Sequence, residues 1–180
     1  HSNSIKDIEI LNYVVEKTED FALVIKGQIQ NKELMVKLIN KKENINLMMC
    51  NQSFIYKYKN DVEIAQKIIS IDPLQIEKFP TFKKDKDMIY YALKCGLSQI
   101  SKIDVSLYSD MDIATSFITK NSINYISLPL DIKNNHEIAL CSIKNSTDFM
   151  MVINNSELDQ DVSFYIKAIR KKHDIFVDKF

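Results

Sequence analysis

Pairs of adjacent apolar residues, spaced four positions apart, recur along this chain just after an acidic residue. When that acid is position zero, the apolar residues fall at positions 1, 2, 5 and 6. The pattern gives Ile64, Ala65, Ile68 and Ile69 after Glu63. This spacing places all four side chains on one face of an α-helix, whereas in a strand it would scatter them over both faces. Each copy therefore predicts an amphipathic helix.

An Asp or Asn stands two residues before the acid in each of seven copies. Its side-chain oxygen can accept from a free N–H of the first helical turn, and the following acid suits the positive end of the helix dipole. The predicted N-cap residues are Asp7, Asn31, Asp61, Asp85, Asp110, Asn135 and Asp159. The acids lie 24 or 25 residues apart, except for a 30-residue step from Glu33 to Glu63. Such a period indicates stacked supersecondary units.

Two further positions predict a second, shorter helix in each copy. Position 9 usually holds a residue that ends a helix easily, and position 16 always holds an apolar anchor. The residues at position 9 include Asp72, Gly96, Asn121 and Ser146, and the anchors are Ile25, Met49, Phe79, Ile103, Leu128, Ile153 and Val177. Pro80 and Pro129 follow an anchor directly and end the second helix, while Asp72 and Pro73 suit its start in the third copy. The unit is a helix-turn-helix hairpin.

One hairpin of this size cannot bury its apolar stripe alone, so neighbouring hairpins must stack. We therefore expect an all-α protein, a right-handed α-solenoid of about seven short helix-turn-helix repeats. Residues 1–180 form a single array in this prediction, with repeats that start near residues 7, 31, 61, 85, 110, 135 and 159. The last copy lacks a polar capping unit, so we expect the chain to be a fragment or module of a larger protein.

Two copies, at 85–107 and 110–130, carry the motif most fully. Their shared features are an Asp-x-acid start, an Ala in the apolar run and a polar or glycine turn. These are Asp87, Ala92 and Gly96 in one copy, and Asp112, Ala114 and Asn121 in the other. In these features the chain resembles short bacterial α-helical repeats of unknown function, found in large proteins and proposed effectors of intracellular bacteria. Only Gly96 keeps the turn glycine, and Lys167 replaces an apolar residue in the last copy. The resemblance implies an interaction or spacer module without catalytic residues, plausible as part of a secreted effector.

Net charge and composition argue against two classes of protein, nucleic-acid binders and proteins that span a membrane. The chain has 24 basic and 24 acidic residues and a net charge of zero, which does not favour a nucleic-acid partner. Binding of single-stranded RNA, which some helical repeats perform with one base per unit, is therefore only a remote alternative. No apolar run reaches the roughly 18 to 20 residues that cross a bilayer, so we expect no membrane span.

Motifs of enzymes and metal sites are absent from the sequence. Gly27 and Gly96 are the only glycines, which excludes the glycine-rich loops that hold phosphates. Neither Cys-x-x-Cys nor His-Glu-x-x-His occurs. His136, beside a cap, and His173, at the predicted start of a second helix, have no Cys or carboxylate partner at ligand spacing. We expect no catalytic residue, no metal and no cofactor.

The cysteines indicate the compartment. Cys50, Cys95 and Cys141 are odd in number, widely spaced and placed in apolar segments. This pattern is typical of buried, reduced thiols and not of a disulfide framework. We expect a reducing compartment, either the cytoplasm or, for a secreted effector, the cytoplasm of a host.

The six extra residues between the second and third copies are the best candidate for a binding surface, because insertions in repeat arrays often map to a binding face. Segment 51–60 contains Phe54, Tyr56, Lys57, Tyr58 and Lys59. These aromatic and basic side chains could hold an acidic peptide or stack on bases. Alternatively, they extend the second helix and pack their rings into the core.

The seven acids could likewise attract a basic peptide or a divalent cation, but helix capping accounts for them with fewer assumptions.

The leading hypothesis is a non-catalytic module that binds another protein, through the groove between hairpins or through segment 51–60. The alternative is a spacer or regulatory arm of a larger enzyme whose catalytic domain lies outside this chain. Fold alone does not decide between these two classes.

Overall fold

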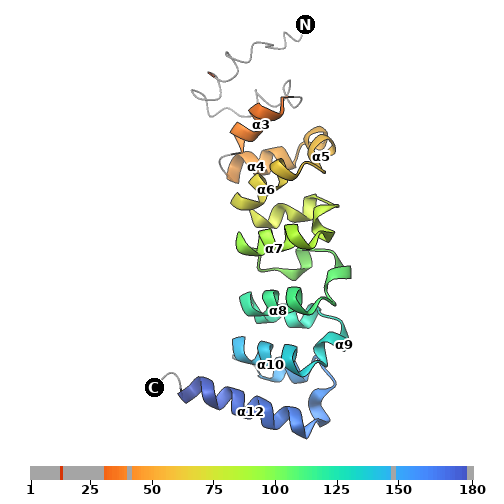
Figure 1. Ribbon diagram of the computed structural model, residues 1–180, viewed down its shortest axis with the longest axis vertical. Helices are drawn as coiled ribbons and strands as arrows, with labels where there is room; N and C mark the ends of the chain where they lie inside the picture. Colours follow the sequence, from red (N-terminus) through yellow and green to blue (C-terminus); the bar gives the residue numbers. More distant parts are fainter. Residues whose placement is uncertain (1–12, 14–30, 40–41, 147–148, 178–180) are drawn as a thin grey trace. The chain divides into compact units, whose positions relative to one another are not determined.

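The computed structural model describes Tyr13 and residues 31–39, 42–146 and 149–177, with side chains up to Lys171 (Figure 1). All regular elements in these ranges are helices, and no strand occurs among them, which confirms the all-α prediction. No helix in the described ranges is long and apolar enough to cross a membrane. The chain divides into two compact units, residues 1–96 and 97–180. We describe each unit by itself.

The first unit contains α-helices and two short 3-10 helices. Its described elements are α3 (Lys32–Leu38), α4 (Lys42–Met49), α5 (Gln52–Tyr58), α6 (Val62–Ile71), η1 (Pro73–Lys78), η2 (Phe82–Lys84) and α7 (Lys86–Lys94). Contacts join α3 to α6 and α6 to α7, so the first helices of successive copies pack on one another.

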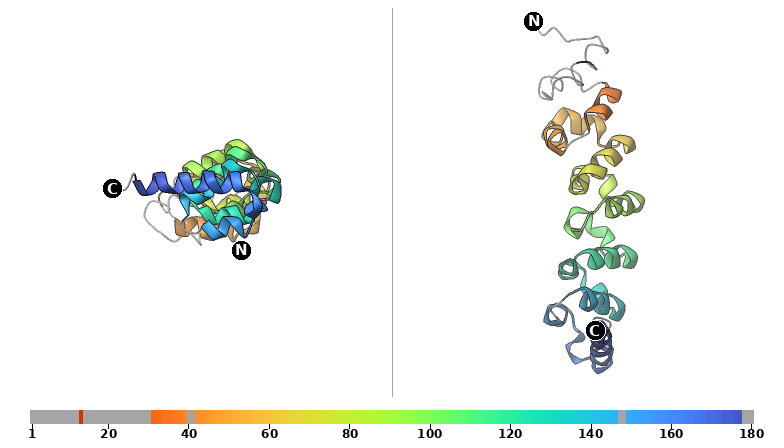
Figure 2. Two further views of the ribbon diagram at one scale, coloured as in Figure 1. Left: turned by 90° about the horizontal axis from the view of Figure 1, so that it is seen from below. Right: turned by 90° about the vertical axis from the view of Figure 1, so that its left-hand side faces the viewer.

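The second unit repeats this plan. Its described elements are η3 (Ile100–Lys102), η4 (Val105–Leu107), α8 (Met111–Lys120), η5 (Ser122–Ser127), α9 (Leu130–Lys133), α10 (His136–Asn145), α11 (Phe149–Ile153), η6 (Leu158–Gln160) and α12 (Val162–Val177). Helix α10 contacts both α8 and α12, and the three helices lie in successive layers (Figures 1 and 2).

Five of the predicted N-caps are confirmed by side-chain hydrogen bonds. In each, the cap oxygen accepts from the backbone N–H three residues later, at distances of 2.9 to 3.3 Å. The five residues are Asn31, Asp61, Asp85, Asp110 and Asn135. Each cap satisfies an N–H that the helix itself leaves without a partner. Asp7 lies outside the described residues.

The predicted apolar stripe is the core of both units. In α6 the residues at positions 1, 2, 5 and 6 are all fully buried, and the same holds for α8. The predicted helix ends are also confirmed, because Asp72, Asn121 and Ser146 are the C-caps of α6, α8 and α10. Gly96 follows α7 with φ of 107°, a conformation that favours glycine.

The second segments of copies three to five, η1, η3 and η5, are 3-10 helices, where the sequence predicts short second helices of unspecified type. Bonds such as Phe79 N to Ile76 O, at 3.0 Å, join residues three apart. Segments of three to six residues are too short to sustain an α-helix, and 3-10 geometry is common at that length. The described anchors are nevertheless buried. These are Met49, Phe79, Ile103, Leu128 and Ile153, whereas Ile25 and the side chain of Val177 lie outside the described residues.

The seventh copy differs from the prediction in two respects. Asp159 is not an N-cap: it lies in η6, and Asp161 instead accepts from Phe164 N at 2.9 Å and begins α12. The start of α12 is set by burial, because a helix that begins after Asp161 places Phe164 and Ala168 in the core. The predicted second helix near His173 is also wrong, because α12 continues unbroken to Val177. Arg170 stands where other copies carry a helix-ending residue, and Arg favours a helix.

A buried asparagine joins the layers of the second unit. Asn124, in η5, is 7% exposed and accepts from Ile100 N at 3.0 Å. Its amide donates to Ser98 O at 2.7 Å and to Phe117 O at 2.9 Å. One side chain thus satisfies backbone groups of its own copy and of the preceding copy, 24 and 26 residues away.

Candidate functional site

Segment 51–60 folds as a separate helix, α5, and not as an extension of α4. Asn51 caps it by accepting from Phe54 N at 3.1 Å. Helical spacing of four residues directs Phe54 and Tyr58 inward, where they are 0% and 3% exposed and their ring centroids lie 5.0 Å apart. Burial, and then the charge of Asp61, raises the pKa of Tyr58. These two of the five predicted binding residues are therefore core residues.

The opposite side of α5 is open to solvent. Tyr56 is 78% exposed, and the Nζ atom of Lys59 lies 5.0 Å from the centroid of its ring. Lys57 is exposed on the same short helix. On the adjoining α4, Leu47 is 51% exposed. We call Leu47, Tyr56, Lys57 and Lys59 the α4–α5 surface. The ring of Tyr56 and the charge of Lys59 lie together, and the same two helices also carry the charge of Lys57, over the Tyr58 ring, and the aliphatic Leu47. These groups suit an acidic segment with an apolar residue.

Two of the predicted acidic sites are bridged by basic side chains of the preceding copy. In the first unit, Lys32 Nζ lies 2.8 Å from both Asp61 Oδ2 and Glu63 Oε2. Hydrogen bonds to Asp61 and then to Glu63 raise the pKa of Lys32 to about 12. Partial burial would raise the pKa of Asp61, but bonds from Lys32 and from Ile64 N outweigh it and the pKa is lowered.

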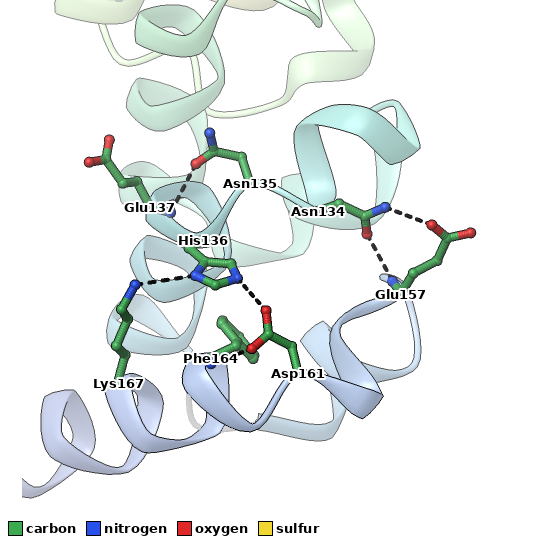
Figure 3. A network of polar contacts seen from close by, with 8 residues as sticks. All are labelled: Asn134, Asn135, His136, Glu137, Glu157, Asp161, Phe164 and Lys167. Carbon is green, nitrogen blue, oxygen red and sulfur yellow. Dashed lines mark hydrogen bonds and ion pairs between the residues drawn. The ribbon is translucent and has the colours of Figure 1, made fainter.

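A second bridge joins α10 to α12 in the second unit (Figure 3). His136 Nε2 lies 2.8 Å from Asp161 Oδ2, and Lys167 Nζ lies 3.4 Å from His136 Nδ1. A proton on Nε2 satisfies both contacts, since Nδ1 can then accept from the lysine. The His136 ring also packs against Phe164, with centroids 5.5 Å apart.

Asp161 supplies the carboxylate of this bridge. Donation from Phe164 N, then from the Ser163 hydroxyl and then from His136 lowers the pKa of Asp161 to about 2. The carboxylate therefore serves two purposes, as N-cap of α12 and as partner of His136. The sequence places no carboxylate at metal-ligand spacing from His136, but the structure pairs the ring with Asp161 in a polar bridge. Its partner lies 25 residues ahead, one repeat along the chain, and the period itself was the signal.

An amide and an acid make a reciprocal contact beside this bridge (Figure 3). Asn134 Nδ2 donates to Glu157 Oε2 at 2.9 Å, and Glu157 N donates to Asn134 Oδ1 at 2.8 Å. Asn135, next in sequence, caps α10 by accepting from Glu137 N at 2.9 Å. Thus three consecutive residues, 134 to 136, link or cap successive copies. Among the cap and acid residues, Asp61, Glu63 and Asp161 also bond to a side chain of the preceding copy.

The acids do not converge on a point. Among the described residues, no three His, Cys, Asp or Glu side chains gather as ligands for a metal ion. Asp72 is the most buried acid of this kind, at 4% exposure. The sequence predicts that Asp72 suits the start of η1, but its side chain does not cap this segment. The carboxylate instead accepts from Gln75 Nε2 at 3.0 Å and faces Lys42 Nζ at 3.8 Å.

The cysteines are less buried than predicted. Cys50 is exposed, and Cys95 and Cys141 are half-buried thiols without a disulfide. None of them occupies position 1, 2, 5, 6 or 16 of its copy, which are the positions that face the core. Cys141 Sγ lies 3.7 Å from Thr119 Oγ1 at the surface between α10 and α8. Apolar neighbours in sequence were a poor guide to burial here.

We compared the chain with protein-family models, with curated proteins and with solved structures. None of the three comparisons found a match. The function must therefore be argued from the residues themselves.

Proposed function

We propose that this chain is a non-catalytic α-solenoid module that binds another protein, with the α4–α5 surface as its binding site. The observation that carries the proposal is Tyr56. It is a large aromatic side chain, 78% exposed, on the one helix that the regular repeat does not require. Exposed aromatic side chains are typical anchors of protein interfaces.

Stacking of the repeats supports the solenoid part of the proposal. Lys32 to Asp61, Asn124 to Ser98 and His136 to Asp161 are contacts between residues 25 to 29 positions apart, close to one repeat. Contacts of this separation recur in both units, and each is polar and specific. Such nearest-neighbour bonding is what a repeat array requires. Small-angle X-ray scattering would test the proposal, because an array and a pair of unstacked units give different pair-distance distributions.

The chemistry of the α4–α5 surface limits the partner. Lys59 supplies a positive charge over the ring of Tyr56, whereas Lys57 Nζ lies 5.5 Å from the centroid of the Tyr58 ring. Leu47 adds an exposed aliphatic side chain on the adjoining helix. A partner segment with acidic residues around one apolar side chain would complement it. The resemblance to repeats in proposed bacterial effectors supports a place for the module in a larger secreted protein.

Affinity capture with two matched variants tests the binding site. We expect Tyr56→Ala to remove the partner that the unmodified chain captures, with Ile123→Ala as the control, because Ile123 is 62% exposed in the second unit. For the purified partner, titration calorimetry should show an affinity at least about tenfold lower for Tyr56→Ala. Equal capture by the unmodified chain and by Tyr56→Ala would refute this site.

A further inference from the structure

Helix α12 has two apolar faces, of which only one is packed. Phe164 and Ala168 are buried, and α12 packs on α10. On the other face, Val162 is 71% exposed, Ile166 46% and Ile169 67%. Their spacing of four and then three residues is that of a seam between two paired helices. Three aliphatic side chains in this arrangement form an unpartnered stripe.

Comparison with the other first helices shows where α12 lacks a neighbour. Eight residues after its N-cap, each first helix from α6 to α10 carries an aliphatic side chain. Ile69, Leu93, Ile118 and Ile143 are at most 4% exposed. Ile169 holds the same place in α12, eight residues after Asp161, and is 67% exposed. The position is therefore covered in the four preceding first helices and open in α12.

Charge along α12 favours a second copy of this chain as the occupant. Glu157 and Asp159 are exposed just before the helix begins, and Arg170 and Lys171 are exposed in its second half. Two such helices side by side in antiparallel orientation place the acidic end of each beside the basic half of the other, whereas parallel pairing places like charges together. The net charge of zero also leaves no overall repulsion between copies.

We propose that a second copy of this chain docks antiparallel on α12, so that the same stripe of both copies forms a two-fold symmetric contact. Ile166 then lies near the symmetry axis, and Val162 of each copy faces Ile169 of the other. A single pair of helices covers less than the roughly 800 Å² per partner of a standard interface. The dimer should therefore be weak and concentration-dependent.

Sedimentation velocity of residues 1–180 over roughly 1 to 500 µM tests the proposal, a range chosen for a weak interface. We expect reversible dimerisation, and Ile169→Glu should weaken it at least about tenfold. The control is Ile123→Glu, which changes a side chain of similar exposure, 62%, elsewhere in the second unit and should dimerise like the unmodified chain. Circular dichroism establishes that both variants keep their helices. A monomer at all concentrations, or equal association of Ile169→Glu and the unmodified chain, would overturn the proposal.

Charge reversal tests the antiparallel orientation. Asp159→Lys and Arg170→Glu should each dimerise more weakly than the unmodified chain, because each places like charges across the contact. An equimolar mixture of the two variants should recover association as a heterodimer, since opposite charges then meet at one end. A mixture that associates no better than either variant alone would contradict antiparallel pairing.

Discussion

Replacement of Asn124 by Ala should destabilise the second unit more than any surface substitution. The side chain is 7% exposed and takes part in three hydrogen bonds, with Ile100 N, Ser98 O and Phe117 O. Alanine removes all three bonds at once. It leaves one backbone N–H and two backbone carbonyls of two successive copies without this partner.

The magnitude follows from the burial of these groups. A hydrogen bond contributes about 0.5 to 1.5 kcal/mol net, and a buried group left unsatisfied costs about 1 to 3 kcal/mol. Two of the three bonds, those to Ile100 N and Phe117 O, are buried, and the bond to Ser98 O is partly buried. Phe117 O keeps a hydrogen bond from Asn121 N at 2.8 Å, so Ile100 N is the buried group that loses its partner outright. With that bond retained, and with water able to reach Ser98 O, we expect a loss of about 2 to 4 kcal/mol in the free energy of unfolding. That is a large part of the roughly 5 to 15 kcal/mol of a typical domain.

Urea denaturation followed by circular dichroism measures this loss. The matched control is Asn154→Ala, since Asn154 is an exposed asparagine in the same unit. It should change the free energy of unfolding by less than about 0.5 kcal/mol. If Asn124→Ala costs less than about 1 kcal/mol, the three bonds do not hold the layers together as we argue.

Three further predictions concern single side chains of the second unit. Because the pKa of Asp161 is lowered to about 2, below the roughly 3.9 of an unfolded aspartate, its stabilisation is complete above about pH 4 and is lost as the pH falls toward 2. Asp161→Ala should thus lower the melting temperature at pH 7 and flatten its acid dependence, whereas Asp159→Ala should do neither. Ser142 is fully buried and its Oγ has no hydrogen-bond partner among the described residues, so Ser142→Ala should raise the free energy of unfolding by about 1 kcal/mol in urea; a loss of stability would show that the hydroxyl is satisfied. The buried hydroxyl of Tyr125 donates to Lys133 O at 2.8 Å, so Tyr125→Phe should cost about 0.5 to 1.5 kcal/mol, and an unchanged urea midpoint would contradict that bond.

Local chemistry explains what the sequence could predict. A cap such as Asp61 bonds an N–H only three residues away, and the stripe that begins at Ile64 depends only on helical geometry. Both signals are complete within one copy of the repeat. Buried anchors such as Phe79 followed from the same reasoning, because seven copies repeat the same apolar position.

Contacts between copies, and competition between nearby residues, explain what the sequence could not predict. Asp159 and Asp161 are equally good caps in sequence, and only the burial of Phe164 decides between them. The bond from His136 to Asp161 needs the repeats to be in register, which no motif within one copy reveals. For segment 51–60, each of the two interpretations holds for part of the segment. Phe54 packs in the core, and Tyr56 is exposed to solvent.

An NMR nuclear Overhauser experiment on the second unit within the full chain measures the register between successive copies. We expect cross-peaks from the side-chain amide protons of Asn124 to Ser98 and Ile100, which lie 26 and 24 residues away in sequence. We also expect slow exchange of the Ile100 backbone N–H, whose acceptor is the buried Asn124 oxygen. Cross-peaks confined to residues within a single hairpin, with fast exchange at Ile100, would contradict this register.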